Sequence, residues 1–136
     1  MPKTTKKTKG YVYALGRRKR SVARIRLLKG KDQTLVNDMP VGRYFKDISP
    51  VYFLKPFELT GTTGKFYVTA KIEGGGKQGQ LGAFTLGVSR ALVKIDENFR
   101  KILRQNGLLT RDPRERERRK FGLAQGARAR KQSPKR

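Results

Sequence analysis

The chain has 136 residues, enough for one domain with a modest core plus extensions, and its 34 Lys and Arg residues against 10 Asp and Glu residues give a formal net charge of +24. Self-repulsion of that size is tolerated mainly beside a polyanion, so nucleic acid is the expected partner. The absence of cysteine and histidine excludes disulfides, thiolate nucleophiles and zinc sites built from those residues, and the lack of any run of about 18 apolar residues argues against a membrane span.

The first part of the chain predicts a basic lead and then strands. Residues 1–10 carry four lysines and no apolar stretch, which predicts a disordered lead rather than a secretory signal and therefore an intracellular, soluble protein. Residues 11–28 alternate between apolar and polar side chains, as in strands, but the pattern is interrupted at residues 16–20. Four consecutive cations there would lie at a bend within one strand or in the loop between two.

A short strand and two short helices are predicted next. Residues 34–36 favour a strand, and residues 41–45 favour one or two helical turns. Ser49 followed by proline is typical of a helix start, with the serine as the cap, and Pro56 limits that helix to about residues 51–57. Residues 65–73 then alternate strictly and predict a further strand.

A helix over residues 80–94 should supply the main core stripe, since its large apolar side chains recur at helical spacing. The helix also carries small residues that would let another backbone or a sheet come close. A second helix is predicted to be capped by Asp96 and to end at Gly107, so the body should end near Thr110. The predicted stripe is Leu81, Phe84, Val88, Ala91, Leu92 and Ile95, and the small residues are Gly82, Ala83, Gly87 and Ser89.

The C-terminal segment is basic and lacks core-forming side chains. Residues 118–136 hold eight Lys or Arg residues and no Asp or Glu. Such a segment buries too little apolar surface to offset its conformational entropy, so we expect it to be disordered alone and to become ordered on a polyanion. Fully extended, it would span roughly 60 Å.

Residues 74–79 spell Gly-x-Gly-x-x-Gly between a strand and a helix, which is the dinucleotide-binding pattern. This pattern also requires an acidic residue at the end of a second strand about 20 residues further on, but Asp96 and Glu97 are predicted to begin a helix. The chain is also too short for an added substrate domain. What remains is a set of backbone N–H groups at a helix start, with Lys77 beside them, which suits a phosphate of RNA as well as one of a coenzyme.

Two further segments concentrate charge. The run at residues 16–24 is either a solvated charge cluster or a phosphate-binding one, because like charges packed this closely repel unless phosphates lie between them. Residues 107–114 follow the end of the second predicted helix and lead into the basic C-terminal segment. Glu115 and Glu117 alternate with arginines and are better interpreted as solvated helix pairs than as an acid/base pair. No catalytic set and no metal site is predicted.

Four segments together resemble the bacterial form of the family named for the ninth protein of the small ribosomal subunit: residues 16–19 with 22–24, 74–83, 107–114, and 117–120 with 135–136. The third is the most specific. The resemblance implies an α+β fold, a single small domain with a mixed sheet covered by helices on one face, like the second domain of ribosomal protein S5, with a left-handed βαβ crossover. It implies a basic lead at 1–10, an RNA-binding body at 11–110 and a long basic tail at 111–136 that penetrates RNA.

The resemblance also implies a place in the subunit head. The expected location is a cytoplasmic ribosome, with an organellar ribosome as the less favoured alternative. Its partners would be small-subunit ribosomal RNA, peptidyl-site transfer RNA and neighbouring ribosomal proteins, with no cofactor, small-molecule substrate or membrane. Lys135 and Arg136 would lie nearest the transfer RNA. The candidate ribosomal RNA contacts are Arg17, Arg18, Lys19, Arg20, Arg24, Lys77, Gln78, Arg111, Arg114, Arg118, Arg119, Lys120, Arg128, Arg130 and Lys131.

Two other functions fit parts of the sequence less well. A DNA-architectural protein would be equally basic, but such proteins insert apolar wedges, and no exposed wedge is evident. A nucleotide-binding enzyme would explain the glycine pattern alone. The sequence therefore predicts an RNA-binding structural protein that is not an enzyme.

Overall fold

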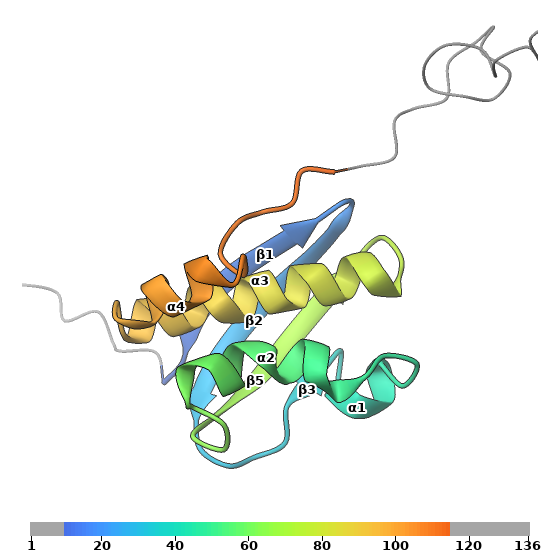
Figure 1. The fold of residues 1–136 in the computed structure, drawn as a ribbon. Coiled ribbons are helices and arrows are strands. Elements are labelled where there is room, and N and C mark those ends of the chain that lie inside the picture. The colour runs from blue at the N-terminus through green and yellow to red at the C-terminus, as the bar shows by residue number, and fades with distance from the viewer. Residues whose placement is uncertain (1–9, 115–136) are drawn as a thin grey trace, which may run out of the picture.

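A computed structural model describes residues 10–114, and in this range five strands form one sheet in the order β1-β2-β5-β3-β4 (Figure 1). Neighbouring strands are antiparallel except β3 and β5, which are parallel, so the sheet is mixed. The strands are β1 (Val12–Arg18), β2 (Ser21–Lys29), β3 (Leu35–Val36), β4 (Met39–Pro40) and β5 (Phe66–Glu73). The helices are α1 (Val41–Tyr44), α2 (Pro50–Thr60), α3 (Lys77–Ile95) and α4 (Phe99–Gln105).

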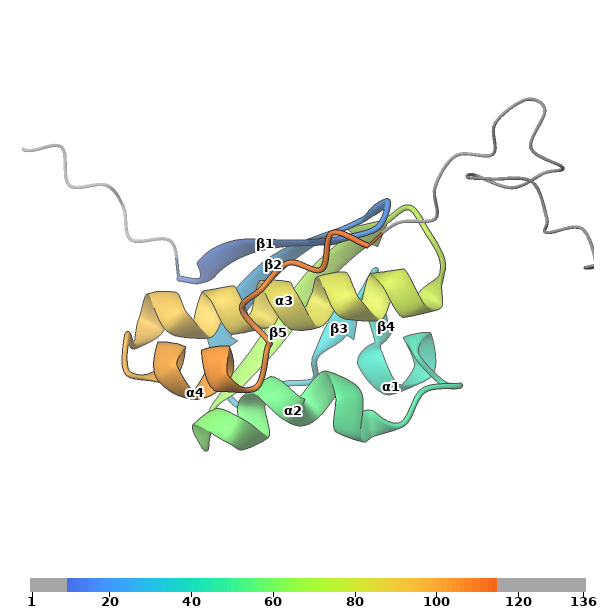
Figure 2. The same cartoon turned by 45° about the horizontal axis from the view of Figure 1, so that its top comes forward.

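The helices cover one face of the sheet (Figure 2). Side chains alternate across a strand, and in β2 Ala23, Ile25 and Leu27 are buried while Arg24 and Arg26 are exposed. The buried set points toward the helices and the arginines point away from them. This confirms the predicted α+β class with a mixed sheet and helices.

Helix α3 is the centre of the core and packs chiefly on β1 and β2. Its predicted apolar stripe is buried from Leu81 to Leu92, and Ile95 at the last turn is half-buried. The rings of Phe84 and Phe45 lie 6.1 Å apart and join α3 to the segment after α1. The periodic spacing of the stripe was therefore sufficient to identify the core face of this helix.

The backbones of β1 and α3 touch at Gly16. A Cβ atom placed on this glycine would collide with the carbonyl oxygen of Ala83 and would lie 2.5 Å from the backbone nitrogen of Gly87. Neither neighbour is a flexible side chain, so the strand can reach the helix only without a side chain at this position. The small residues of α3 were predicted to allow such an approach, and this is confirmed.

Residues 11–28 form two strands rather than one bent strand. Arg18 pairs with Ser21, so only Lys19 and Arg20 make the turn between β1 and β2. Lys19 has a φ of 54°, in the left-handed region that tight hairpin turns require. The cationic run is thus split between the end of one strand and the tip of a hairpin.

Helix α2 was predicted to end at about residue 57 because of Pro56, but it continues to Thr60 and is followed by Gly61, whose φ is 65°. Proline removes one backbone donor from the helix, which is a local cost. Here Pro56 and Phe57 are both buried in the core, and their burial offsets the missing hydrogen bond. Ser49 occupies the cap position, but its side chain makes no capping hydrogen bond.

The start of α3 and the capping residue of α4 also differ from the prediction. Helix α3 begins at Lys77, not at residue 80, because the backbone N–H of Gln80 already donates to the carbonyl of Gly76 at 2.9 Å. Asp96 lies at the end of α3 and accepts a hydrogen bond from the N–H of Asn98, which is the residue in the cap position of α4.

Strand β4 was not predicted, since it has two residues and includes a proline. Asn37 and Asp38, both at positive φ, form the two-residue turn that folds β4 back on β3. The chain then crosses through α1 and α2 to reach β5 parallel to β3. This is the crossover that the resemblance implies to be left-handed, and its hand stays a prediction.

Other predictions lie outside the described residues: most of the basic lead and the tail beyond residue 114. Among the residues described, no helix combines the length and apolar character needed to cross a bilayer.

Replacing Gly16 with Ala should destabilise the protein by about 2 kcal/mol or more, because backbone atoms on α3 cannot move aside for the new methyl group. Thermal and urea unfolding measure the change. Gly42→Ala is the control, since nothing lies within 4 Å of a Cβ atom at that exposed helical position; it should be neutral or slightly stabilising. Equal stability of the Gly16→Ala variant and the wild type would contradict the backbone contact.

Candidate nucleic-acid interface

Three of the predicted basic segments meet at one end of the body, which we call the hairpin end. It comprises the β1–β2 tip at residues 17–20, the glycine-rich loop at residues 74–78 and the start of the tail at residues 110–114. In both views the tip, this loop and the described end of the tail lie together (Figures 1 and 2). The segments are distant in sequence, so only folding of the sheet against α3 brings them together.

Hydrogen bonds join the hairpin to the glycine-rich loop. The Ser21 hydroxyl donates to the Gly74 carbonyl at 2.9 Å, and the side-chain amide of Gln80 donates to the same oxygen at 3.1 Å. A Cβ atom on Gly75 would collide with the Ser21 hydroxyl oxygen, so glycine is needed for this close packing. The loop is therefore a rigid neighbour of the hairpin tip.

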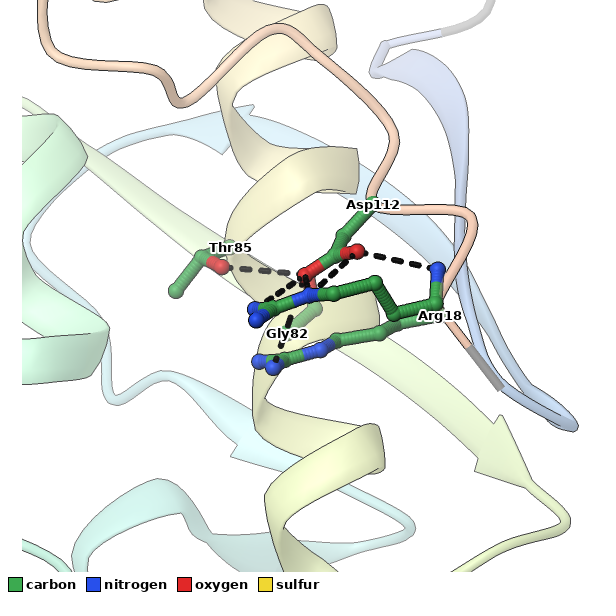
Figure 3. Close-up of polar contacts among 5 residues, drawn as sticks. Arg18, Gly82, Thr85 and Asp112 are labelled. Carbon is green, nitrogen blue, oxygen red and sulfur yellow. Dashed lines mark hydrogen bonds and ion pairs between the residues drawn. The ribbon is translucent and has the colours of Figure 1, made fainter. Parts of the chain in front are cut away.

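Arg18 points inward from β1 and lies across α3 at Gly82 (Figure 3). A Cβ atom on Gly82 would collide with the Arg18 side chain, so the glycine makes room for the arginine stem. One terminal nitrogen of Arg18 is 3.8 Å from the Asp112 carboxylate. Within the part of the chain that the structure describes, the Nε of Arg18 is buried and has no hydrogen-bond partner. Arg18 thus connects the hairpin, the helix and the tail.

Asp112 organises the start of the tail. Its carboxylate accepts hydrogen bonds from the Arg114 guanidinium at 2.7 to 3.0 Å and from the Arg114 backbone N–H at 3.0 Å. The side-chain hydrogen bonds from Arg114, more than the backbone bond and the charges of Arg114 and Arg18, lower the pKa of Asp112 from 3.8 to about 2. The carboxylate is therefore ionised over the physiological range and holds two arginines from different parts of the chain.

A shallow cavity of about 260 Å³ separates the hairpin from the tail, and its lining includes Arg17, Arg18, Thr110, Asp112 and Arg114. Three arginines and one aspartate contribute to this lining, so the cavity carries a net positive charge. Arginine presents a planar fork of donors that matches phosphate oxygens. The geometry suits contact with a nucleic-acid backbone at this end of the body.

Lys77 does not extend freely at the start of α3. Its ammonium group lies 3.6 Å from the centroid of the Tyr44 ring and donates to the Tyr44 carbonyl at 3.1 Å. The Tyr44 hydroxyl in turn donates to Gln80 at 2.6 Å, which fixes the ring against α3. Lys77 therefore serves the packing of α1, and its role as an RNA contact stays a prediction.

The other predicted contacts fall into three groups. Lys19, Arg20 and Gln78 are exposed at the hairpin end, and Arg111 is exposed in the tail start. Arg24 lies apart from them on the outer face of the sheet. The remaining candidates lie outside the described residues: Arg118, Arg119, Lys120, Arg128, Arg130, Lys131, Lys135 and Arg136.

Sequence reasoning missed the residues that assemble the site. Ser21 and Asp112 make the contacts between segments, yet neither stands out in a basic run. One available signal was that Asp112 is the only acidic residue between Asn98 and Arg114. Among the described residues, no group of three or more acidic side chains is arranged to hold a metal ion.

Asp112→Asn should release the tail start from the hairpin, because an amide loses the charge that attracts Arg114 and Arg18. Backbone NMR should show altered amide shifts and faster exchange at Arg114. In the wild type, the contact should be complete above pH 3.8 and be lost as the pH falls through about 2, since the pKa is lower in the folded state.

Asp47→Asn is the matched control, since Asp47 is an exposed carboxylate after α1 and forms no ion pair within the described residues. It should leave the Arg114 amide unchanged. If the Arg114 signals of the Asp112→Asn variant match those of the wild type at pH 7, the carboxylate does not hold the tail.

Comparison with known proteins agrees with the resemblance drawn from the sequence. The family described as "Ribosomal protein S9/S16" matches residues 16–136. The protein "Small ribosomal subunit protein uS9" of Chlorobium luteolum is 45% identical over 115 residues, which cover 84% of this chain and 89% of that protein. The chain belongs to the ribosomal protein S9/S16 family.

Proposed function

We propose that this protein is a structural component of the small ribosomal subunit that binds ribosomal RNA through the hairpin end and through its basic tail. The observation that carries the proposal is the meeting of the β1–β2 tip, the glycine-rich loop and the tail start in one positively charged region. Family membership supports the ribosomal setting, and the net charge of +24 supports a polyanionic partner.

The finer assignments follow from the family. The tail would pass through RNA in the head of the subunit, beside neighbouring ribosomal proteins, until Lys135 and Arg136 reach the transfer RNA in the peptidyl site. The protein would act in the cytoplasmic ribosome by neutralising phosphates and fixing RNA structure, without catalysis. Asp112 supports this arrangement, because it directs the start of the tail along the hairpin end.

Co-sedimentation tests the proposal most directly. The full chain, added to small subunits reconstituted without it, should sediment with them in stoichiometric amount and should protect defined ribosomal RNA positions. Failure to join the particle, with the protein shown to be folded, would contradict the proposal.

Replacing Arg17, Lys19 and Arg20 together with Gln should weaken binding to small-subunit ribosomal RNA and flatten its salt dependence by about two units of log–log slope. Each lost phosphate contact removes about 0.7–0.9 units through counterion release. Arg18 is left in place because it packs against Gly82 and faces Asp112, so its loss would disturb the fold. Filter binding at several salt concentrations gives the slope.

The charge-matched control replaces Lys55, Lys101 and Arg104, which are exposed on α2 and α4. This variant removes the same amount of charge, but from the helical layer and not from the hairpin end. It should therefore change the salt dependence of RNA binding less. An equal effect of both triple variants would mean that binding depends on net charge and not on the hairpin end.

Deleting residues 133–136 should lower peptidyl-site transfer RNA affinity severalfold while leaving assembly of the protein into subunits intact. The deletion removes two of the 34 Lys and Arg residues. An exposed phosphate contact contributes on the order of 1 kcal/mol to binding, which corresponds to less than a tenfold change in affinity. Transfer RNA binding and protein content are measured on the same purified subunits. Unchanged transfer RNA affinity would show that residues 133–136 do not contact the transfer RNA.

A further inference from the structure

The outer face of the sheet, opposite the helices, combines cations with an aromatic ring. Strand register sets Tyr13 beside Arg26 on β2, and Arg24 beside Lys71 on β5. These four residues, which we call the outer face, are all exposed, and Tyr13 retains 45% of its surface. A tyrosine this open, set among cations, has no role in the core.

The cations of the outer face have no ion-pair partner among the described residues. Arg24 faces Lys71 directly, and like charges opposite one another on neighbouring strands are destabilising. Within residues 10–114, neither these two nor Arg26 forms an ion pair. Glu73, the acidic residue of β5, is exposed on the same face diagonal to Arg24, but it forms no ion pair among the described residues. An external anion that lies across the strands would reduce the repulsion between Arg24 and Lys71.

Arg26 is held on this face by a neighbouring ring. Its guanidinium carbon lies 5.1 Å from the centroid of the Tyr11 ring, within the range of a cation–π contact. The guanidinium is thereby kept close to the sheet surface, near its register partner Tyr13. Cation and ring are thus presented side by side before any ligand binds.

The free edge of β1 is covered by side chains from α3. Arg90 donates to the Leu15 carbonyl at 2.8 Å, and Lys94 donates to the Tyr13 carbonyl. These contacts occupy backbone acceptors that an added strand from another protein would need. They also bring two more positive charges to the edge beside Tyr13. The face of the sheet, rather than its edge, is therefore the surface open to a partner.

We propose that the outer face binds an unpaired stretch of ribosomal RNA, with one base stacked on Tyr13 and adjacent phosphates at Arg24, Arg26 and Lys71. The identification of the partner as RNA rests on the proposed function. A duplex would offer the cations phosphates but would leave the ring without a base face, whereas an unpaired nucleotide satisfies both. The surface is separate from the hairpin end and adds a second type of contact, stacking.

The test uses the full chain and small-subunit ribosomal RNA transcribed with 5-iodouridine, which cross-links on irradiation to aromatic rings in contact with the base. Mass spectrometry of the digested complex should locate a cross-link at Tyr13. Tyr52 is the internal control, because it is 60% exposed on α2, in the helical layer. A cross-link at Tyr52 but not at Tyr13 would overturn the proposal.

Substitution gives the second readout. Tyr13→Leu should weaken binding to the same RNA about tenfold, which is about 1.4 kcal/mol, without changing the salt slope, since stacking releases no counterions. Tyr13→Phe should bind within about twofold of the wild type because it keeps the ring. Tyr52→Leu should have no effect. Thermal unfolding checks that each variant remains folded.

The outcomes separate this inference from the proposed function. If the wild type binds the RNA and the hairpin variant weakens it, but Tyr13→Leu does not, only the stacking inference fails. The inference also fails if Tyr13→Phe loses as much affinity as Tyr13→Leu, or if Tyr13→Leu weakens a duplex RNA of the same length equally. If the wild type does not bind ribosomal RNA at all, both proposals fail.

Discussion

The contact between the backbones of β1 and α3 at Gly16 determines the geometry on which the rest of the body depends. Because no side chain separates strand and helix there, the first turns of α3 run directly beneath the hairpin. Gly82 then lies under the Arg18 stem, and the glycine-rich loop comes within hydrogen-bonding distance of Ser21. A larger residue at Gly16 would separate these layers, and the hairpin, the loop and the tail start would no longer share one surface.

The positive charge of this protein is divided between two roles. Arg18, Lys77, Arg90 and Lys94 are directed at acceptors within the chain: a carboxylate for the first and backbone carbonyls for the others. Arg114 also binds the Asp112 carboxylate, whereas other exposed cations, such as Lys19 and Arg20 at the hairpin end and those of the outer face, have no such acceptor among the described residues. The net charge therefore overstates how many cations lack an internal acceptor.

Asp112 illustrates how one carboxylate can organise a basic site. It reduces the repulsion between Arg18 and Arg114, which come from the first strand and from the tail. Without it, the positively charged tail start would be repelled from a positively charged hairpin. An acidic residue inside the proposed nucleic-acid interface is therefore compatible with binding, because it positions the cations around it.

The sequence alone determined the class of the fold, the core face of α3, the strand at β5 and the strongly basic character of the chain, because periodicity and charge are local properties that survive folding. It did not determine the length of α2, since the burial of Pro56 and Phe57 depends on the surrounding core. Nor did it identify Ser21, Asp112 or Tyr13. The neighbours of each are distant in sequence or on an adjacent strand, and only the packing of β1 and β2 against α3 brings them together.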